Sequence, residues 1–249
     1  MIFRQLIEPL SNTCTYLLGC ETSGLAVLID PVVNSVDRDL AVLQALGLRL
    51  AFTLDTHVHA DHITGALHLK QRCGSRIAAP AIDQLRCTDV GIVEGTPLQV
   101  GSLVLQPLHT PGHTAGHFSY RMPDRVFTGD ALLIDGCGRT DFQQGDAQTL
   151  YRSVTDKLFT LPDEHLVYPG HDYSDRRVSS IGQEKARNPR LGKNRSLAEF
   201  TQLMDKLNLP YPKFIDYAVP GNLLCGVCPD DLPDQLSAYC RSMTESRQG

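Results

Sequence analysis

Several features that define other classes of protein are missing from this sequence of 249 residues. Lys and Arg number 23 against 28 Asp and Glu, and the net charge of −5 argues against a general affinity for nucleic acid or anionic membranes. No apolar run approaches the roughly 20 residues that a membrane-spanning helix needs. The N-terminal stretch has an early acid and a proline, Glu8 and Pro9, and lacks the long apolar segment of a signal peptide. We therefore expect a cytoplasmic, bacterial protein that binds neither nucleic acid nor a membrane.

An internal repeat and a low-complexity linker are also missing. Hydrophobic residues make up 42% of the chain and charged residues 20%, which is enough apolar material for a substantial core. A chain of this length favours one large domain. We expect a single domain over residues 1–249, in which residues 179–249 form a C-terminal helical extension packed on the rest.

Cysteine is present but scattered along the chain, at Cys14, Cys20, Cys73, Cys87, Cys137, Cys225, Cys228 and Cys240. The chain is large enough to fold without disulfides and carries no visible export signal, so we expect reduced thiols. Cys225 and Cys228 form a CxxC pair, but no second pair accompanies them. We interpret this pair as a turn with two thiols, not as a zinc or redox site.

The hydrophobic pattern predicts strands that alternate with helices. Strands are expected at residues 3–9, 14–19, 25–31, 48–55, 77–80 and 166–168, with a further strand-like region broken by turns at 98–133. Helices are expected at 36–46, 63–73, 147–159, 181–187, 197–207 and 232–243. Strand clusters that alternate with helices indicate a layered α/β architecture.

The most informative motif is His57-x-His59-x-Asp61-His62, which places four potential metal ligands within six residues. It follows the buried strand predicted at 48–55, and we expect Asp61 and His62 to stand at the start of the next helix. A lone histidine or a lone aspartate before a helix is usually structural, but the four together indicate a metal site. Imidazole and carboxylate ligands suit a catalytic metal with open positions better than a closed structural one.

Three further ligand candidates, His113, Asp130 and His171, stand far along the chain. Each directly follows a glycine after a strand-like run. Because loops at one edge of a sheet are where a rigid scaffold presents reactive groups, we expect these side chains to join the first motif. His117 is expected to pack or hydrogen-bond near the site. The remaining histidines have no such context and are expected to be structural: His68, His109 and His165.

These motifs, in this order, resemble the metallo-β-lactamase superfamily over at least residues 10–175. The resemblance implies an αββα sandwich, in which two β-sheets lie face to face, helices cover the outside and the metal binds at one edge. In the glyoxalase II branch, which hydrolyses glutathione thioesters, the full set of ligands binds two metals. In that pattern the ligands form two sets bridged by Asp130: His57, His59 and His113 on one metal, and Asp61, His62 and His171 on the other.

A more specific resemblance lies in residues 136–145, which read Gly-Cys-Gly-Arg-Thr-Asp-Phe-Gln-Gln-Gly. This stretch is similar to the persulfide dioxygenase family. The glyoxalase II stretch also begins Gly-Cys-Gly-Arg, but it then runs through two aromatic residues to Glu-Gly. Two later segments, at residues 171–173 and 188–191, match the dioxygenase pattern as well. The resemblance reaches to about residue 195.

This resemblance implies a mononuclear non-haem enzyme with one Fe(II) per chain. Its substrates would be glutathione persulfide and O₂, which with water give glutathione and sulfite. The iron ligands would be His57, His113 and Asp130, because two histidines and one carboxylate fill one face of an octahedron and leave three adjacent positions free.

The other polar residues of the motifs would then support the ligands and the chemistry. His171 and Asp61 would take part in catalysis, and four residues would surround the ligands without binding the iron: His59, Asp61, His62 and His171. Three residues match glutathione-contacting positions of the family: Arg139, Tyr173 and Arg190. The alternative for Arg139 is a surface salt bridge with Asp141.

Two other functions stay open on the sequence. One is a dinuclear hydrolase of glutathione thioesters, because all seven of its ligands are present. The other is a non-catalytic protein that binds a metal or a persulfide. The intact ligand set argues against this function. A homodimer is compatible with the resemblance, although the sequence displays no dimerisation seam.

Overall fold

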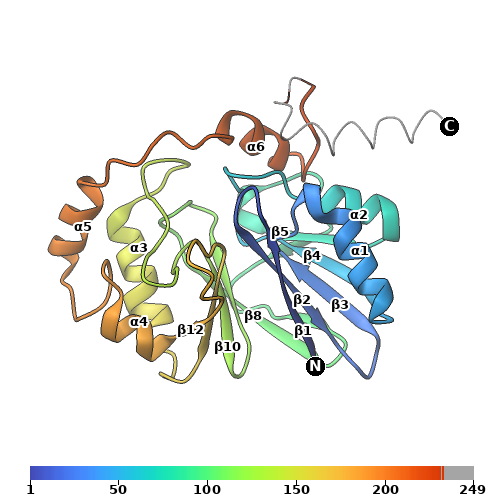
Figure 1. Cartoon of the computed structure of the whole chain (residues 1–249), viewed down its shortest axis with the longest axis horizontal. Helices are drawn as coiled ribbons and strands as arrows, with labels where there is room; N and C mark the ends of the chain where they lie inside the picture. Colours follow the sequence, from blue (N-terminus) through green and yellow to red (C-terminus); the bar gives the residue numbers. More distant parts are fainter. Residues whose placement is uncertain (231, 233–249) are drawn as a thin grey trace.

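Two β-sheets packed face to face form the centre of the molecule (Figure 1). The structure, a computed structural model, describes residues 1–230 and residue 232. The first sheet has six strands in the order β1-β2-β3-β4-β5-β6. These strands are β1 (Ile2–Glu8), β2 (Thr13–Gly19), β3 (Leu25–Ile29), β4 (Arg49–Leu54), β5 (Arg76–Pro80) and β6 (Val90–Ile92).

The second sheet also has six strands, in the order β12-β11-β10-β9-β8-β7. They are β7 (Leu98–Val100), β8 (Leu103–His109), β9 (Phe118–Arg121), β10 (Arg125–Gly129), β11 (Leu166–Pro169) and β12 (Ser179–Ser180). Strands β3 to β6 pair in parallel, as do β10 and β11, while the remaining neighbours pair antiparallel. Parallel neighbours need a crossover connection, and helices supply it between β3 and β4, β4 and β5, and β10 and β11.

Helices cover both outer faces of the sandwich (Figure 1). Helices α1 (Val36–Ala45) and α2 (Ala66–Cys73) lie on the first sheet, where Val36 and Leu43 pack against Leu17 and Leu28. Helices α3 (Ala147–Ser153), α4 (Ile181–Arg187) and α5 (Leu197–Asp205) cover the second sheet. The predicted αββα architecture is therefore confirmed.

The core between the sheets contains a cluster of aromatic rings. Tyr16 of β2 lies 5.0 Å from Phe127 of β10, measured between ring centroids, and Phe127 lies 5.6 Å from Tyr168 of β11. The Tyr16 hydroxyl donates a hydrogen bond to the carbonyl of Pro169 at 2.6 Å, which satisfies its polar atom inside the core. This contact ties the first sheet to the loop that carries His171.

The loops that leave four strands meet at one edge of the sandwich. His57 follows β4, His113 follows β8, Asp130 follows β10 and His171 follows β11, as the sequence predicted. Helix α6 (Ile215–Asn222) lies across this edge, above both sheets (Figure 1). The strand ends therefore carry the candidate ligands, and a helix from late in the chain lies above them.

Several elements differ from the expectations. Helix α2 begins only at Ala66, so Asp61 and His62 lie in the preceding loop and not at the start of a helix. The side-chain contacts described below hold this loop. The short strands β6 and β12 and helix α6 were not predicted. The helix expected at 147–159 ends in a π-helical turn, Val154–Leu158. Residue 231 and residues 233–249 lie outside the described residues. The prediction of a helix at 232–243 and of the end of the C-terminal extension falls on them.

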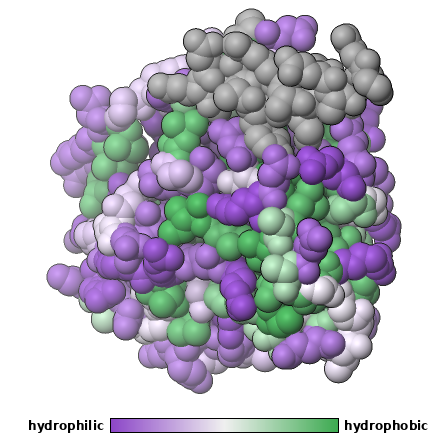
Figure 2. All heavy atoms as spheres, turned by 45° about the vertical axis from the view of Figure 1, so that its right-hand side comes forward, coloured by the Kyte–Doolittle hydropathy of each residue, from purple (hydrophilic) through white to green (hydrophobic). Residues whose placement is uncertain are grey.

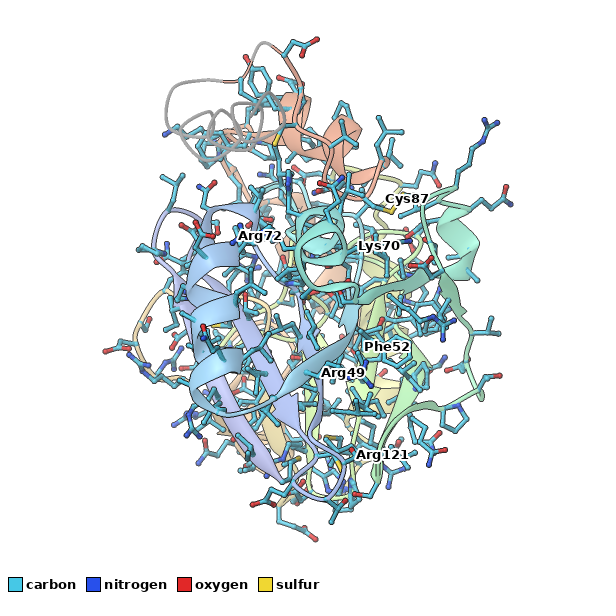
Figure 3. The ribbon with its side chains drawn as sticks, turned by 90° about the vertical axis from the view of Figure 1, so that its right-hand side faces the viewer. Arg49, Phe52, Lys70, Arg72, Cys87 and Arg121 are labelled. Carbon is cyan, nitrogen blue, oxygen red and sulfur yellow. A yellow bond between two sulfur atoms is a disulfide. The ribbon has the colours of Figure 1, made fainter. Side chains whose placement is uncertain are left out.

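The expectation of reduced thiols is wrong for Cys87 and Cys225, which form a disulfide across 138 residues of sequence, and for Cys228, which is also disulfide-bonded. The interpretation of Cys225 and Cys228 as a turn with two thiols is therefore wrong as well. The side chains of Cys87 and Cys225 belong to a small apolar cluster with Ala66 and Ile77, beside the start of α2. Cys87 is labelled in Figure 3. Sequence spacing could not predict the pairing of Cys87 with Cys225, because it depends on how the segment after α6 packs against the first sheet. Cys14, Cys20, Cys73 and Cys137 are free, as expected.

Within the described part of the chain, no helix is long and apolar enough to cross a membrane. The face in Figure 2 carries hydrophilic side chains interspersed with hydrophobic ones.

Candidate metal centre

The ligand atoms of His57, His113 and Asp130 lie within 4.8 Å of one another, so the structure brings together the predicted triad. His57 is 3% exposed, and His113 Nε2 lies 3.5 Å from Asp130 Oδ2. The three residues come from loops after β4, β8 and β10, which belong to both sheets. The triad therefore stands where the two sheets meet at the edge of the sandwich.

Neighbouring groups fix the orientation of each triad residue. His113 Nδ1 lies 2.7 Å from the carbonyl of Arg139, to which it donates, and this leaves Nε2 as the metal-binding nitrogen. His57 Nδ1 lies 2.9 Å from Thr56 Oγ1. The backbone N–H of Asp130 donates to His117 Nε2 at 3.0 Å, which confirms that His117 hydrogen-bonds beside the site.

The protonation state of His57 suits a metal ligand. Burial, with the charges of His59 and His113, holds the pKa of His57 well below its usual range. Its imidazole is therefore neutral and able to offer a lone pair. Asp130 Oδ1 is buried and has no hydrogen-bond partner in the described residues, an arrangement that costs free energy unless a cation or another group occupies the position. The donor set and this open oxygen both fit a metal.

Two glycines are required by close contact with the triad. A Cβ atom on Gly138 would lie 2.8 Å from His113 Nδ1, and one on Gly170 would lie 2.5 Å from Asp130 Oδ1. Contacts this short do not occur for real side chains, so a larger residue would displace a ligand. The glycines beside the candidate ligands therefore serve close packing.

A second cluster contains His59, Asp61 and His62, whose ligand atoms also lie within 4.8 Å of one another. His62 Nδ1 is 3.0 Å from Asp61 Oδ2 and 3.1 Å from Thr13 Oγ1. His171 Nε2 stands between the clusters, 3.6 Å from Asp61 Oδ2 and 3.5 Å from Asp130 Oδ1. The structure thus gathers all the predicted site residues of the motifs, but it divides them into two groups.

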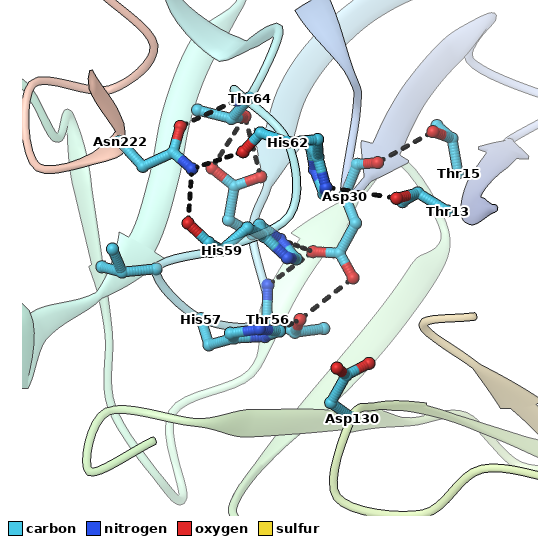
Figure 4. Close-up of polar contacts among 12 residues, drawn as sticks. Thr13, Thr15, Asp30, Thr56, His57, His59, His62, Thr64, Asp130 and Asn222 are labelled. Atoms are coloured by element: carbon cyan, nitrogen blue, oxygen red, sulfur yellow. Dashed lines mark hydrogen bonds and ion pairs between the residues drawn. The ribbon is translucent and has the colours of Figure 1, made fainter. Parts of the chain in front are cut away.

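His59 is directed toward a buried carboxylate that the sequence analysis missed. His59 Nε2 lies 3.1 Å from Asp30 Oδ1, and both side chains are 2% exposed (Figure 4). Burial would lower the pKa of His59, but the Asp30 carboxylate outweighs it and raises that pKa to about 9. Asp30 directly follows β3, as the predicted ligands follow their strands. Its position after a strand was the signal that could have identified it.

Opposite charges surround His171 and Asp61. Burial acts against both charged forms, yet the neighbouring groups outweigh it. Asp130 and Asp61 raise the pKa of His171, while His62 and His171 hold the pKa of Asp61 well below its usual range. His171 is therefore predisposed to carry a proton next to the triad.

A cavity of about 540 Å³ is lined by two triad residues, His113 and Asp130, and by the predicted substrate residues. Asp61 and His171 also line it. The wall includes the three residues that match the glutathione-contacting positions: Arg139, Tyr173 and Arg190. The volume is in the range of sites that bind small organic ligands.

These three residues differ in the contacts that their side chains already make within the protein. Arg139 pairs with both oxygens of Asp141, at 2.6 and 2.7 Å, and also donates to the carbonyl of Pro210. The salt bridge considered from the sequence is thus present. Arg190 donates from Nη1 to the carbonyl of Cys137 at 2.7 Å. Tyr173 is 71% exposed, and its ring stacks on His171 at 5.8 Å.

Part of the cavity wall was not predicted from the sequence. The segment 209–213, which precedes α6, supplies Tyr211 and Lys213 to the lining. Tyr211 packs edge-on against Phe142 at 5.5 Å, and its hydroxyl donates to Asp216 at 2.7 Å. No motif marks this segment, because its place at the cavity depends on the path of the chain from α5 to α6.

Comparisons with known proteins agree with this geometry. Residues 81–171 match the model of the metallo-beta-lactamase superfamily. The chain is 49% identical over 232 residues to the persulfide dioxygenase ETHE1, mitochondrial, of Bos taurus, and 48% identical to that of Homo sapiens. Each alignment covers 91% of this chain and 89% of the relative. The crystal structure of ETHE1 from Myxococcus xanthus has 54% identity and a TM-score of 0.89, and the match covers 91% of this chain and all of that one.

Proposed function

We propose, on the premise that this chain belongs to the persulfide dioxygenase family within the metallo-β-lactamase superfamily, that it oxidises glutathione persulfide at one Fe(II) per chain. The persulfide dioxygenase activity rests on relatives that are 48% and 49% identical over most of their length. Glutathione as the carrier and iron as the metal are the finer parts of the proposal. The observation that carries them is the triad of His57, His113 and Asp130, of which His113 and Asp130 line the cavity.

The overall reaction balances without any further co-reactant. Glutathione persulfide, O₂ and water give glutathione, sulfite and two protons. The outer sulfur is oxidised, O₂ is reduced, and the sulfur–sulfur bond breaks so that the inner sulfur leaves as the thiol of glutathione. The chain must therefore bind an anionic sulfur, admit O₂ and water, and accept protons near the reacting sulfur.

His57, His113 and Asp130 would hold the iron through two imidazole nitrogens and one carboxylate oxygen. Bound by these residues, iron would supply the redox chemistry that joins O₂ to the persulfide sulfur. His117, through the backbone of Asp130, and the carbonyl of Arg139, through His113, keep the ligands oriented.

His171 and Asp61 are the groups that would handle protons. His171 Nε2 lies between Asp130 and Asp61, and these carboxylates favour its protonated form. A protonated imidazole can neutralise an anionic sulfur that enters the cavity. It can also donate to the departing thiolate, and the Asp61 carboxylate, which stays charged, favours the protonated imidazole that donates.

Tyr173 and Arg190 would position the peptide part of the substrate. Glutathione carries two carboxylates, and a guanidinium can bind a carboxylate through two parallel hydrogen bonds. Arg190 uses Nη1 for the Cys137 carbonyl, so its other nitrogens can face the substrate. Arg139 already donates hydrogen bonds to the Asp141 carboxylate and the Pro210 carbonyl. We propose that its positive charge attracts the substrate while these hydrogen bonds stay in place.

One observation favours a second candidate, the dinuclear hydrolase of glutathione thioesters. His59 Nδ1 and His62 Nε2 are buried without hydrogen-bond partners in the described residues, and these nitrogens could bind a second metal. The Asp30 carboxylate does not exclude this candidate, because its contact with His59 Nε2 leaves Nδ1 of the same ring free for a metal. The preference for one iron rests on the relatives and on the separate triad of His57, His113 and Asp130.

One experiment separates the two candidates. The protein is purified without oxygen, iron and zinc are counted per chain, and O₂ consumption is followed after addition of glutathione persulfide. We expect close to one iron per chain, prompt O₂ uptake and formation of sulfite. Two zinc ions per chain, hydrolysis of glutathione thioesters and no O₂ uptake would contradict the proposal.

A further inference from the structure

We propose that Asn222 of α6 is a positioning residue, which holds the loop 59–64 in the shape that catalysis needs. Asn222 is 4% exposed. Its Oδ1 accepts a hydrogen bond from the N–H of Thr64 at 2.8 Å, and its Nδ2 donates to the carbonyls of His59, at 2.9 Å, and His62, at 2.8 Å (Figure 4). One side chain thus binds three backbone groups of the loop that bears Asp61.

An amide is chemically matched to this task. The loop presents one N–H and two carbonyl groups, and the side chain of asparagine offers one acceptor oxygen and two donor hydrogens. Residues 59–64 form no helix or named strand, so regular secondary structure does not satisfy these backbone groups. Buried backbone groups need partners, and Asn222 supplies them from about 160 residues further along the chain.

The segment that follows α6 holds Asn222 in place. The N–H of Leu67, next to the loop, donates to the carbonyl of Cys225 at 3.1 Å, and the disulfide to Cys87 ties Cys225 to the first sheet. Gly226 has a φ of +100°, and a Cβ atom there would lie 2.2 Å from the carbonyl oxygen of Thr64. The backbone of the segment after α6 therefore lies directly against the loop.

The first sheet and the loops that leave it hold the same loop through side chains. Thr64 Oγ1 donates to both carboxylate oxygens of Asp55, at 3.0 and 3.1 Å, and Asp55 directly follows β4. Thr13 of β2 also contacts the side chains of Asp61 and His62, and Asp30 contacts that of His59. The first sheet thus holds side chains of the loop, and α6 holds its backbone through Asn222. Only the contact to α6 reaches the carbonyls of His59 and His62, which flank Asp61.

The loop 59–64 contains Asp61 but none of the three triad residues. It carries Asp61, which lines the cavity beside His171. His113 and Asp130 lie on the loops that follow β8 and β10, and none of the three hydrogen bonds of Asn222 reaches the triad. Loss of Asn222 should therefore slow the chemical steps without loss of the metal or of substrate affinity. This inference rests on the proposed function, in which Asp61 and His171 handle protons.

The test compares Asn222→Ala and Asn222→Asp with the wild-type enzyme. Alanine removes all three hydrogen bonds, and aspartate keeps the acceptor but sets a negative charge against two carbonyl oxygens. We expect kcat for O₂ uptake with glutathione persulfide to fall about 10- to 100-fold in both variants, as for other residues that orient a metal site indirectly. The iron content should stay near that of the wild type and KM should change less than about twofold.

Leu43→Ala serves as the matched control, because Leu43 is a residue of α1 that is 3% exposed and belongs to a core cluster that contains none of the site residues. It lowers stability through a cavity in the core, and its kcat at a temperature well below unfolding should stay near that of the wild type. An equal fall in kcat for Leu43→Ala would attribute the effect to stability and overturn the proposal. So would a kcat within twofold of wild type for Asn222→Ala, or a loss of iron in proportion to activity.

Hydrogen exchange tests the structural part without any assay of activity. In Asn222→Ala the amide of Thr64 loses its acceptor, so its exchange should speed up by at least about tenfold while amides of β8 stay unchanged. Unchanged exchange at Thr64 would overturn the positioning role. If the wild-type enzyme consumed no O₂ with persulfide while the Thr64 amide behaved as expected, the proposed function alone would fail.

Discussion

His59→Ala distinguishes most sharply between one metal and two. His59 lies in the opening motif and would bind a metal together with His57 and His113 in the dinuclear arrangement. In the structure its Nε2 lies 3.1 Å from Asp30 Oδ1, and His59 belongs to the cluster with Asp61 and His62 and not to that of the triad. We therefore expect His59→Ala to keep close to one iron per chain.

The cost of this substitution appears in stability. The buried carboxylate of Asp30 accepts hydrogen bonds from Thr56 N at 2.7 Å, from Thr56 Oγ1 at 3.0 Å and from His59 Nε2 at 3.1 Å. The substitution removes one of these three. A hydrogen bond to a charged group contributes about 1.5–3 kcal/mol, so the free energy of unfolding should fall by that amount. In a chain of this size, that corresponds to a decrease in Tm of about 3–12 °C.

Metal analysis and thermal unfolding of His59→Ala check both statements, with His113→Ala as the control that should lose its metal in either arrangement. A drop in metal content for His59→Ala as large as that for His113→Ala would refute our reasoning about the triad. An unchanged Tm would refute the role assigned to the contact with Asp30.

Four other substitutions test separate parts of the site and the fold. Asp130→Ala should lose both iron and activity, as measured by metal analysis and O₂ uptake; retained iron would exclude it as a ligand. His171→Ala should keep the iron but lower kcat about 100- to 10,000-fold, the usual contribution of a proton-transfer group, and a parallel loss of iron would make it a ligand. Arg190→Ala should raise KM for glutathione persulfide about 10- to 150-fold with a smaller change in kcat, since a charged hydrogen bond to the substrate is lost; an unchanged KM would reject that contact. Cys87→Ser should lower the free energy of unfolding in urea by about 2–5 kcal/mol under non-reducing conditions, because the disulfide closes a long loop; equal stability would indicate that the disulfide does not form.

The hydrophobic pattern located most strands because the strands of the sandwich interior are strongly apolar, while the αββα order of the layers came from the resemblance to the superfamily. Leu17, Leu28 and Leu54 are fully buried in strands that the hydrophobic pattern located within one or two residues. The strands β6 and β12 were missed because they have only three and two residues, too few for a pattern. Helix α6 was missed because it contains Pro220, which usually excludes a residue from the interior of a helix.

The candidate ligands could be predicted because each stands where a strand ends, next to a glycine or within a dense motif. Asp30 and Asn222 could not be identified as easily, because a single aspartate or asparagine is common at a turn or a helix end. Their roles depend on contacts between segments far apart in sequence, such as the bonds from Asn222 to the carbonyls of His59 and His62. The same reason explains why the disulfide between Cys87 and Cys225 was not expected.

Titration of Fe(II) into the metal-free enzyme tests the central claim most directly, namely that one metal bound by His57, His113 and Asp130 supports persulfide oxidation. Metal-free protein at known concentration receives increasing Fe(II) without oxygen, and the initial rate of O₂ uptake with persulfide is then measured at each ratio. We predict a rate that rises linearly and reaches its plateau at one Fe(II) per chain. A plateau only at two metals per chain, or no O₂ uptake at any ratio, would contradict the account.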